Sequence, residues 1–466
     1  MLDCNLSTVT EFMHNHPERL GMSPRALISR RKFLKTAATA VIAAPFISQR
    51  LQAQPASRTL RHASFGAGGM AWSDLTEIAN CPNVEIVAIC DVDLDRTLAA
   101  RKRFPEAKIY QDWRKLLDRE AKNIDAVNVS TPDHMHAPIA VSAMQLGKHV
   151  YGQKPLAHEV HEVRRMADLA HRQKVVTQMG IQVHSSVFYR MAVQLVQDGV
   201  IGRIKEVHSW CPKSWGDSAA RPERSDPVPA NFDWNLWLGV CADRPFIGGG
   251  YYHPSNWRKR LEFGTGTLGD MGCHIFDPVF EAIGLTAPVS VRSEGPAPNQ
   301  WNWALDGLVH YQFAGTHRTA EKTLPITWYG GSSKAPAEVI ALIEGDEIPN
   351  MGSIVIGTGG VMLLPHFDVR PALYPAAKFK DFKLPHIKGV NHWHQFVEAC
   401  RGEGKTTADF AYAAPLTETI LLGDIASRFP QTTLAWNARR MRFDLREADQ
   451  YLQRSYRAGW EIKGLG

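Results

Sequence analysis

Residues 65–71 read FGAGGMA and follow the short apolar run TLRHASF of residues 59–65. The spacing fits the pattern G-x-G-x-x-A, in which a tight turn joins a β-strand to an α-helix. The first glycine permits the bend, the second lets the backbone approach a pyrophosphate, and the small third residue allows close packing of the helix on the strand. The positive end of the helix then faces the phosphate. The stretch predicts a strand from residue 60, a helix from about Met70 to Asn80, and dinucleotide contacts from Gly66, Gly68, Gly69 and Met70.

A second apolar run, NVEIVAIC at residues 83–90, leads into Asp91, which lies 25 residues beyond Gly66. An acid at this position accepts hydrogen bonds from the ribose diol of a dinucleotide. Its negative charge repels a 2′-phosphate, so the sequence favours NAD over NADP as the cofactor. Arg96 lies close by and leaves NADP open, because a guanidinium can pair with that phosphate.

The chain continues with alternating short strands and helices up to about residue 182. This alternation requires crossover connections and therefore a parallel sheet. We expect an α/β fold whose first domain, residues 59–182, is a Rossmann domain with a doubly wound parallel sheet. The expected helices lie near residues 95–103, 113–119, 136–146 and 160–171, and the further strands near 108–109, 125–131, 148–153 and 175–181.

A different pattern precedes this domain. Residues 29–35 read SRRKFLK, and an apolar stretch follows at residues 37–47. The paired arginines fit a twin-arginine signal, and the apolar stretch is shorter than the roughly 20 residues that a membrane span needs. We expect residues 1–53 to be a removable leader, the twin-arginine export machinery to be a partner, and the protein to be exported to the periplasm without a stable membrane anchor. A basic loop before a buried helix is the alternative.

Composition argues against several other classes. The formal net charge is +6, but residues 1–53 hold seven basic and three acidic residues and so carry four of these charges. Nucleic acid and anionic membranes require a concentrated basic face on the folded part, so neither is expected as a partner. The seven cysteines form no C-x-x-C pair, and their odd number and scattered spacing fit neither a disulfide framework nor a zinc site. They are expected to be mostly buried free thiols.

Four segments occur in an order and spacing that resemble one enzyme family. They are GAGGMA at residues 66–71, STPDHMHA at 130–137, QKP at 153–155 and GTGTLGDMGCHIFD at 264–277. Together they resemble the Gfo/Idh/MocA family of sugar and cyclitol oxidoreductases. The resemblance implies an α+β substrate domain over residues 183–466, with a large open, mostly antiparallel sheet that covers the active site and often mediates homo-oligomer formation. Strand-like stretches that begin near residues 288, 307, 324 and 353 fit such a sheet.

The resemblance also implies three catalytic residues. Lys154 matches the family's E-K-P lysine beside the nicotinamide, although Gln153 stands where the family usually has glutamate. Asp270 and His274 match its D-x-x-x-H pair, and residues four apart share one face of a helix. Oxidation of an alcohol needs a proton acceptor, and imidazole titrates in the useful range. We expect His274 to be the base, Asp270 to bind a substrate hydroxyl and Lys154 to assist electrostatically. The alternatives are a solvated helix face and a surface lysine in a turn fixed by Pro155.

Two further groups complete the predicted site. Thr131, Pro132 and His136 are expected to contact the cofactor together with Gln153 and Lys154. His134 and His136 form an H-x-H pair, but no third ligand stands at a defined spacing, so no metal is expected. The stretch YYHPSNWR offers flat rings and hydrogen-bond donors suited to a sugar. It predicts substrate contacts from Tyr252, His253, Asn256, Trp257 and Arg258, although packing of an aromatic loop explains it equally well.

An exported cofactor limits the reactions that are open. The twin-arginine route resembles one that carries proteins already folded around their cofactor, but free NAD cannot replace bound NADH outside the cell. A second step must therefore return the hydride. Reduction of a second sugar makes a ping-pong oxidoreductase that acts on a sugar, glycoside or cyclitol. Alternatively, oxidation at C3 acidifies the C2 proton, lets the anomeric substituent leave, and ends in net glycoside cleavage after water addition and reduction. A sugar-binding protein without chemistry is the third hypothesis.

Overall fold

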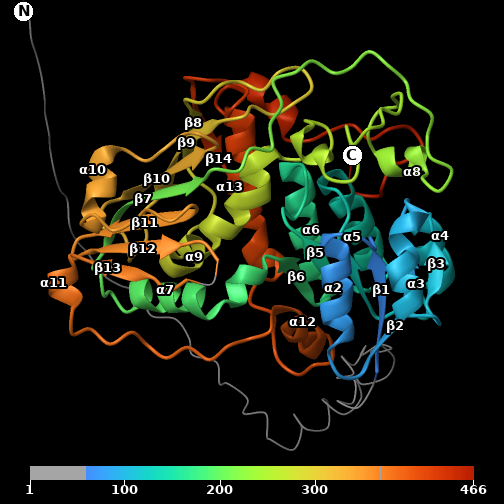
Figure 1. Cartoon of the computed structure of the whole chain (residues 1–466), viewed down its shortest axis with the longest axis horizontal. Helices are drawn as coiled ribbons and strands as arrows, with labels where there is room; N and C mark the ends of the chain where they lie inside the picture. Colours follow the sequence, from blue (N-terminus) through green and yellow to red (C-terminus); the bar gives the residue numbers. More distant parts are fainter. Residues whose placement is uncertain (1–58, 368, 466) are drawn as a thin grey trace, which may run out of the picture. The chain divides into compact units, whose positions relative to one another are not determined.

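A computed structural model describes residues 59–367 and 369–465, so the predicted leader over residues 1–53 lies outside the described residues. The first half of the described chain forms a six-stranded parallel sheet with the order β3-β2-β1-β4-β5-β6 (Figure 1). Since β1 is central and the chain moves outward from it in both directions, the sheet is doubly wound, as the alternating pattern predicts. The strands are β1 (Leu60–Phe65), β2 (Val84–Cys90), β3 (Lys108–Tyr110), β4 (Ala126–Val129), β5 (His149–Gln153) and β6 (Thr177–Gly180).

Helices cover both faces of this sheet. Side chains along each strand alternate between the two faces, so each face carries apolar residues that helices bury. Phe65 of β1 packs into one buried cluster with Ala137, whereas Leu60 packs into another with Ile78. The helices of this half are α2 (Met70–Ala79), α3 (Leu98–Arg103), α4 (Trp113–Glu120), α5 (His136–Gln145) and α6 (Val160–Gln173). A late helix, α12 (His392–Cys400), adds Phe396 to the cluster of Leu60. The chain therefore returns to the first sheet beyond residue 390, which a division at residue 182 does not anticipate.

The second half contains a nine-stranded sheet with the order β13-β12-β11-β7-β10-β9-β8-β14-β15 (Figure 1). β7 and β10 run parallel, and the other neighbouring strands are antiparallel, which confirms the expected mostly antiparallel sheet. The strands are β7 (Ile204–Cys211), β8 (Ser290–Ser293), β9 (Gly307–Ala314), β10 (Thr323–Gly330), β11 (Gly352–Gly357), β12 (Val361–Pro365), β13 (Ala372–Tyr374), β14 (Thr433–Asn437) and β15 (Arg442–Phe443).

Helix α13 (Phe410–Ala426) lies between the two sheets (Figure 1). It contacts α6 and β6 on one side and β8 and β9 on the other. Apolar residues lie on all sides of it, as is usual for a helix enclosed by protein, and Leu416, Ile420 and Leu422 are almost completely buried. The remaining helices are α7 (Val187–Gln197), α8 (Trp234–Leu238), α9 (Cys273–Ile283), α10 (Ala337–Ile340) and α11 (Ala376–Phe379).

Two findings bear on the expectations from composition. Among the described residues, no helix is both long enough and apolar enough to cross a membrane. The six cysteines of the described part of the chain are buried and free, as their scattered spacing predicts.

Gly66 occupies the first position of the phosphate turn, and its replacement by alanine is expected to destabilise the fold. Its φ is +100°, and an added Cβ would lie 2.6 Å from the carbonyl oxygen of Ser130. Gly147 is a matched control, because its φ is +72° but nothing lies within 4 Å of an added Cβ. Gly147→Ala should cost about 1–2 kcal/mol of unfolding free energy, and Gly66→Ala clearly more. Urea unfolding of both variants checks the order, and equal losses would contradict it.

Candidate active site

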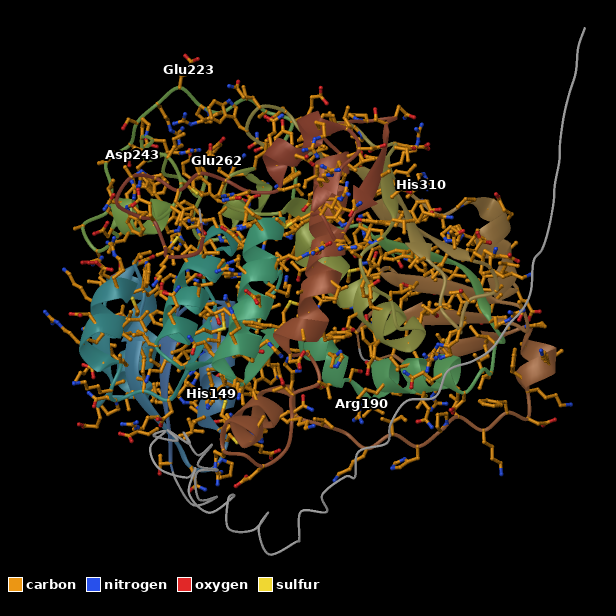
Figure 2. All side chains as sticks on the ribbon, turned by 180° about the vertical axis from the view of Figure 1, so that it is seen from behind. His149, Arg190, Glu223, Asp243, Glu262 and His310 are labelled. Carbon is orange, nitrogen blue, oxygen red and sulfur yellow. The ribbon has the colours of Figure 1, made fainter. Side chains whose placement is uncertain are left out.

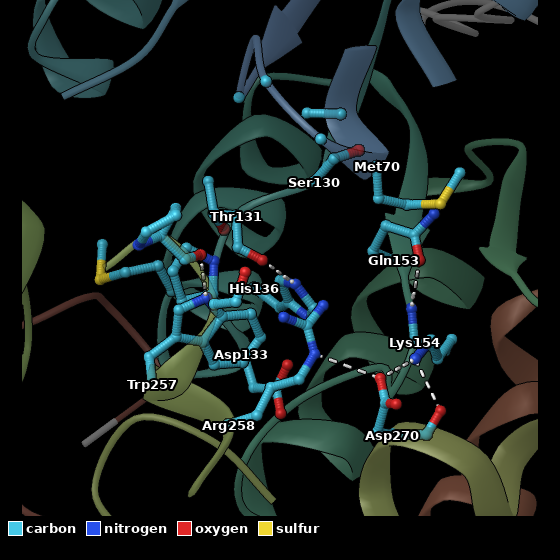
Figure 3. A pocket seen from close by; sticks show the side chains of 18 of the residues that line it. Met70, Ser130, Thr131, Asp133, His136, Gln153, Lys154, Trp257, Arg258 and Asp270 are labelled. Atoms are coloured by element: carbon cyan, nitrogen blue, oxygen red, sulfur yellow. Dashed lines mark hydrogen bonds and ion pairs between the residues drawn. The ribbon is translucent and has the colours of Figure 1, made fainter. Parts of the chain in front are cut away.

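A cavity of about 590 Å³ lies at the carboxyl ends of β1, β2, β4 and β5, where open α/β sheets bind ligands (Figure 3). Fifteen of the seventeen residues predicted for cofactor, catalysis and substrate line it. They are Gly66, Gly68, Gly69, Met70, Asp91, Thr131, Pro132, His136, Gln153, Lys154, His253, Trp257, Arg258, Asp270 and His274. Residues from separate parts of the sequence thus meet in one place.

The other two, Tyr252 and Asn256, do not line this cavity. The Tyr252 side chain is only 2% exposed and packs among aromatic rings, with Trp234 at 5.2 Å and Phe263 at 5.4 Å between centroids. Asn256 donates its side-chain amide to the carbonyl oxygen of Gly250 at 2.8 Å. These two side chains hold the loop together, which is the packing alternative to sugar contact.

Asp91 fixes the dinucleotide turn at one end of the cavity. Its carboxylate accepts the backbone N–H groups of Ala67 at 2.9 Å and Asp93 at 3.0 Å. Burial raises the pKa of Asp91 to about 6, so the carboxyl group is mostly ionised at neutral pH. His253 lies at this same end, because its Nε2 is 2.9 Å from Asp93 and its ring stacks on Phe232. This places His253 beside the predicted ribose site.

The turn fits a dinucleotide pyrophosphate. An added Cβ at Gly68 would collide with the guanidinium of Arg96, which therefore lies across the turn and adds a positive charge there. Helix α2 begins after Gly69 without a side-chain cap and without an acidic residue in its first turn. Its first N–H groups thus lack intrahelical partners and suit phosphate oxygens. The buried hydroxyl of Thr131 also has no hydrogen-bond partner within the described residues.

Lys154 and Asp270 form an ion pair at the other end of the cavity (Figure 3). The Nζ of Lys154 lies 2.7 Å from Oδ1 of Asp270 and also donates to the Asp270 carbonyl oxygen at 2.6 Å. Arg258 donates its Nε to the same carboxylate oxygen at 3.2 Å. The other oxygen accepts the indole N–H of Trp215 at 2.8 Å, with the Nζ of Lys213 at 3.9 Å.

This arrangement determines the charge of Asp270. Burial alone would raise the pKa of its carboxyl group, but the charges of Lys154 and Arg258 hold that pKa well below its usual range. Asp270 therefore stays ionised in the working pH range. It can accept a hydrogen bond from a hydroxyl group, but it cannot serve as the proton acceptor of the reaction.

His274 lies one turn beyond Asp270, and the turn that contains Asp270 is not α-helical. Residues Leu268–Gly272 form a π-helical turn ahead of α9, instead of the α-helix that we expected. Two glycines allow the wide turn to pack closely, since an added Cβ at Gly272 would lie 2.6 Å from the side chain of Ile420. The acid and the imidazole still face the same cavity.

His274 is suited to accept a proton. Burial and then the charge of Lys154 lower its pKa well below the usual value, so its imidazole is neutral. Its Nδ1 is buried without a partner among the described residues. A second imidazole, His366, lies 5.9 Å away between centroids, and Nδ1 of His366 is 2.5 Å from the hydroxyl group of Tyr189. Burial, Lys213 and Lys154 lower the pKa of His366 to about 4.

Sequence reasoning missed three residues of this site: Lys213, Trp215 and His366. Lys213 and Trp215 follow β7, and His366 follows β12. No local motif marks them. The only signal available for His366 was its position just after the strand-like stretch that begins near residue 353, and the strand before Lys213 and Trp215 was not predicted.

Gln153 is linked to a buried carboxylate that the sequence did not reveal. Its side-chain amide donates to Oδ2 of Asp74 at 2.8 Å. Asp74 also accepts hydrogen bonds from Ser130 at 2.7 Å and Trp393 at 2.9 Å, and burial raises its pKa to about 6. The carboxyl group of Asp74 thus lies next to Gln153, which stands where the family usually has glutamate.

The two histidines of the H-x-H pair bind backbone carbonyl groups. The ring nitrogens of His136 lie 2.8 and 2.7 Å from the carbonyl oxygens of Pro155 and Thr131. Nε2 of His134 lies 2.9 Å from the carbonyl oxygen of Trp237. His136 therefore ties the loop after β4 to the segment after β5, and the described residues contain no cluster of three potential metal ligands.

The fold and this site define a two-domain dinucleotide-binding protein. A model of the oxidoreductase family with an NAD-binding Rossmann fold matches residues 60–181, and a model of its C-terminal alpha/beta domain matches residues 200–316. The chain belongs to the Gfo/Idh/MocA family, and its first domain is the NAD-binding domain of that family.

Curated relatives are similar to this chain over part of its length. A levoglucosan dehydrogenase from Pseudarthrobacter phenanthrenivorans is 25% identical over 197 residues, 42% of each chain. An alpha-N-acetylgalactosaminidase from Shewanella oneidensis is 30% identical over 159 residues, 32% of this chain and 34% of the relative. The matched stretches thus span less than half of these relatives.

Solved structures share the fold along most of the chain. The WlbA dehydrogenase from Bordetella pertussis, in complex with NADH and UDP-GlcNAcA, has a TM-score of 0.57 at 16% identity and covers 82% of this chain and 99% of its own. An aldose-aldose oxidoreductase from Caulobacter crescentus, complexed with glycerol, has a TM-score of 0.54 at 16% identity and covers 81% and 100%.

Proposed function

We propose that the protein is an NAD-dependent oxidoreductase acting on a CH–OH group of a sugar, glycoside or cyclitol. The observation that carries this proposal is the placement of Lys154, Asp270 and His274 in the cavity that begins at the phosphate turn. When bound, NAD supplies the hydride acceptor. The relatives and solved structures whose names refer to sugars support the substrate class.

The chain's own residues have separate tasks in this proposal. Ionised Asp270 accepts a hydrogen bond from one substrate hydroxyl and so orients the sugar ring. Neutral His274 takes the proton of the hydroxyl that is oxidised. The Lys154 ammonium group stabilises the negative charge that develops on that oxygen, in a partly buried site where such an interaction is strong.

Glycoside cleavage through transient oxidation is the second candidate. Two observations favour it: a relative named as a glycosidase, and the presence of two neutral imidazoles, His274 and His366, near one reaction centre. Oxidation at C3 would be followed by removal of the C2 proton, departure of the anomeric group, water addition and return of the hydride. Cleavage of a chromogenic glycoside without added nicotinamide would establish this reaction.

We also propose that the protein takes up its cofactor before export to the periplasm by the twin-arginine route. The SRRKFLK stretch at residues 29–35 supports this proposal. Free, buried cysteines fit folding in a reducing compartment. The expected homo-oligomer stays a prediction.

Release of the nucleotide by denaturation of the purified protein, followed by mass analysis, tests the proposal. We expect NAD and not NADP, because ionised Asp91 repels a 2′-phosphate. Since the pKa of Asp91 is about 6 in the free protein, affinity for NAD should fall as the pH drops through 6 and the carboxylate is protonated. A screen of sugars for a change in nicotinamide absorbance then identifies the substrate. Protein that contains no nicotinamide and binds none on titration would instead be a sugar-binding protein without redox chemistry.

A further inference from the structure

A buried carboxylate lies behind the wall of the NAD cavity and has no task in the proposed reaction. It belongs to Asp74 of α2, which is completely buried. The wall in front of it is formed by Gln153, the last residue of β5. Figure 2 shows His149, the first residue of β5, on the opposite side of the molecule from Glu262. Strand β5 thus runs from that side of the molecule to the cavity, and Asp74 lies at its inner end.

Four neutral side chains donate hydrogen bonds to this carboxylate. The hydroxyl group of Ser130 lies 2.7 Å and the amide nitrogen of Gln153 lies 2.8 Å from Oδ2. The indole N–H of Trp393 donates to Oδ1 at 2.9 Å, and the side chain of Gln182 is the fourth donor. These donors come from the carboxyl ends of three neighbouring strands and from α12. A group that only accepts hydrogen bonds is an ionised carboxylate, so the network stabilises the charged form.

No cation cancels this charge within residues 59–367 and 369–465. The hydrogen-bond partners of Asp74 are the neutral groups just named, and no lysine, arginine or histidine forms an ion pair with it. Asp270 is different, since it is paired with Lys154. Because the protein interior screens a charge only weakly, the field of Asp74 extends into the space that Gln153 lines.

The nicotinamide ring of the cofactor belongs beside Gln153. The phosphate turn lies at one end of the cavity, and the ion pair of Lys154 and Asp270 lies at the other. Hydride transfer requires contact between the ring and the carbon that is oxidised, so the ring must reach this second end. Figure 3 shows Gln153 next to Lys154, whose backbone N–H donates to Oε1 of Gln153 at 3.3 Å. The Gln153 side chain thus separates Asp74 from the ring.

We propose that Asp74 raises the affinity of the protein for NAD relative to NADH. The oxidised nicotinamide ring carries a positive charge and the reduced ring carries none, so a fixed negative charge behind the ring stabilises only the oxidised form. The phosphate turn binds both forms alike, because their pyrophosphates are identical. This inference rests on the cofactor of the proposed function and not on its substrate.

The presence of glutamine at position 153 fits this role. A glutamate there would bring a second carboxyl group into hydrogen-bond contact with Asp74, and two carboxylates at that distance cannot both stay ionised. Glutamine instead donates to Asp74 and keeps it charged. A site that favours NAD over NADH also makes the bound NADH a stronger hydride donor. This suits a protein whose cofactor must be reoxidised without leaving.

Equilibrium dialysis of the purified protein against equal concentrations of NAD and NADH tests the inference. It is done at about pH 8, well above the pKa of about 6 of Asp74. Bound nucleotides are released by denaturation and quantified by mass, with equilibrium approached from NAD-loaded and from NADH-loaded protein. Asp74→Asn keeps the size of the side chain and removes its charge. It should lower the ratio of bound NAD to bound NADH by about tenfold, the effect of one charge on another across a side chain at an effective dielectric constant of about 20.

Two further variants separate the charge from the structure of the network. Ser130→Ala removes one donor but keeps the carboxylate, so the ratio should not change. Asp74→Asn combined with Gln153→Glu moves the carboxylate to the cavity wall and reverses the hydrogen bond between the two positions. This double variant should restore the preference for NAD, and it keeps a pair of matched partners if the single Asp74→Asn variant does not fold.

An unchanged ratio in Asp74→Asn would overturn the inference, and so would equal weakening of both nucleotides, because the network would then only support the fold. A double variant that binds both nucleotides without regaining the preference would also contradict it. If the ratio shifts as expected but no sugar is oxidised, only the proposed function fails. If a sugar is oxidised and the ratio stays the same in Asp74→Asn, only this inference fails. Protein that binds neither nucleotide would remove both.

Discussion

Lys154→Ala is expected to lower kcat by about a hundredfold to a thousandfold, the loss seen when one fixed donor to a developing negative charge is removed. The ammonium group contacts Asp270 at 2.7 Å and lies in the cavity that we assign to NAD and substrate. Binding of NAD at the phosphate turn should persist, because that turn lies at the opposite end of the cavity. Stopped-flow measurement of NADH formation with the substrate found by screening gives kcat and KM separately.

The same variant should also change the pH profile. The charge of Lys154 helps to keep the pKa of His274 low, so its removal raises that pKa. Activity depends on neutral His274 and is lost as pH falls through this pKa. The acidic limb of kcat/KM should therefore move to higher pH. Lys148→Ala is the control, since that side chain donates to the carbonyl oxygen of Ile124 at the amino ends of β4 and β5, away from the cavity. Unchanged kcat in Lys154→Ala would remove the lysine from the mechanism.

The parts of the fold that the sequence predicted depend on local constraints. Between Leu60 and Asp91 the chain makes one strand, turn, helix and strand, and each element follows from residues close to it in sequence. Only glycine is tolerated at φ +100° with a carbonyl group against it, so Gly66 is informative without any knowledge of the rest of the chain.

The parts of the site that were missed depend on distant pairing. His366 reaches His274 only because β12, β11 and β7 are neighbours in the large sheet, and such a strand order cannot be read from one sequence. Asp74 is a similar case, since it stands in a helix pattern and meets Gln153 only because α2 packs on β1 and β4, and β4 is the neighbour of β5 in the sheet. Residue type alone predicted a sugar contact at Tyr252, but its side chain is buried among other aromatic rings.

His274→Ala is expected to lower kcat by about a hundredfold to ten-thousandfold, the range for loss of a general base. The buried, neutral imidazole is the group best placed to take the hydroxyl proton, since Asp270 is held ionised by Lys154 and Arg258. The acidic limb of the pH profile should disappear with the imidazole, and partial rescue by added imidazole should follow if the cavity admits it. NAD affinity should be unchanged, which separates loss of chemistry from loss of the fold.

The variant His366→Asn distinguishes the two candidate reactions when its effects are compared with those of His274→Ala. If the protein only exchanges hydride, one base suffices, and His366→Asn should reduce kcat far less than His274→Ala does. If the protein cleaves glycosides, a second proton transfer occurs at C2 or at the leaving group, and His366 is the other neutral imidazole at hand. The variant should then still reduce NAD with sugar but lose cleavage of a chromogenic glycoside. Equal loss of both activities would show that His366 supports the shape of the site through Tyr189 and transfers no proton itself.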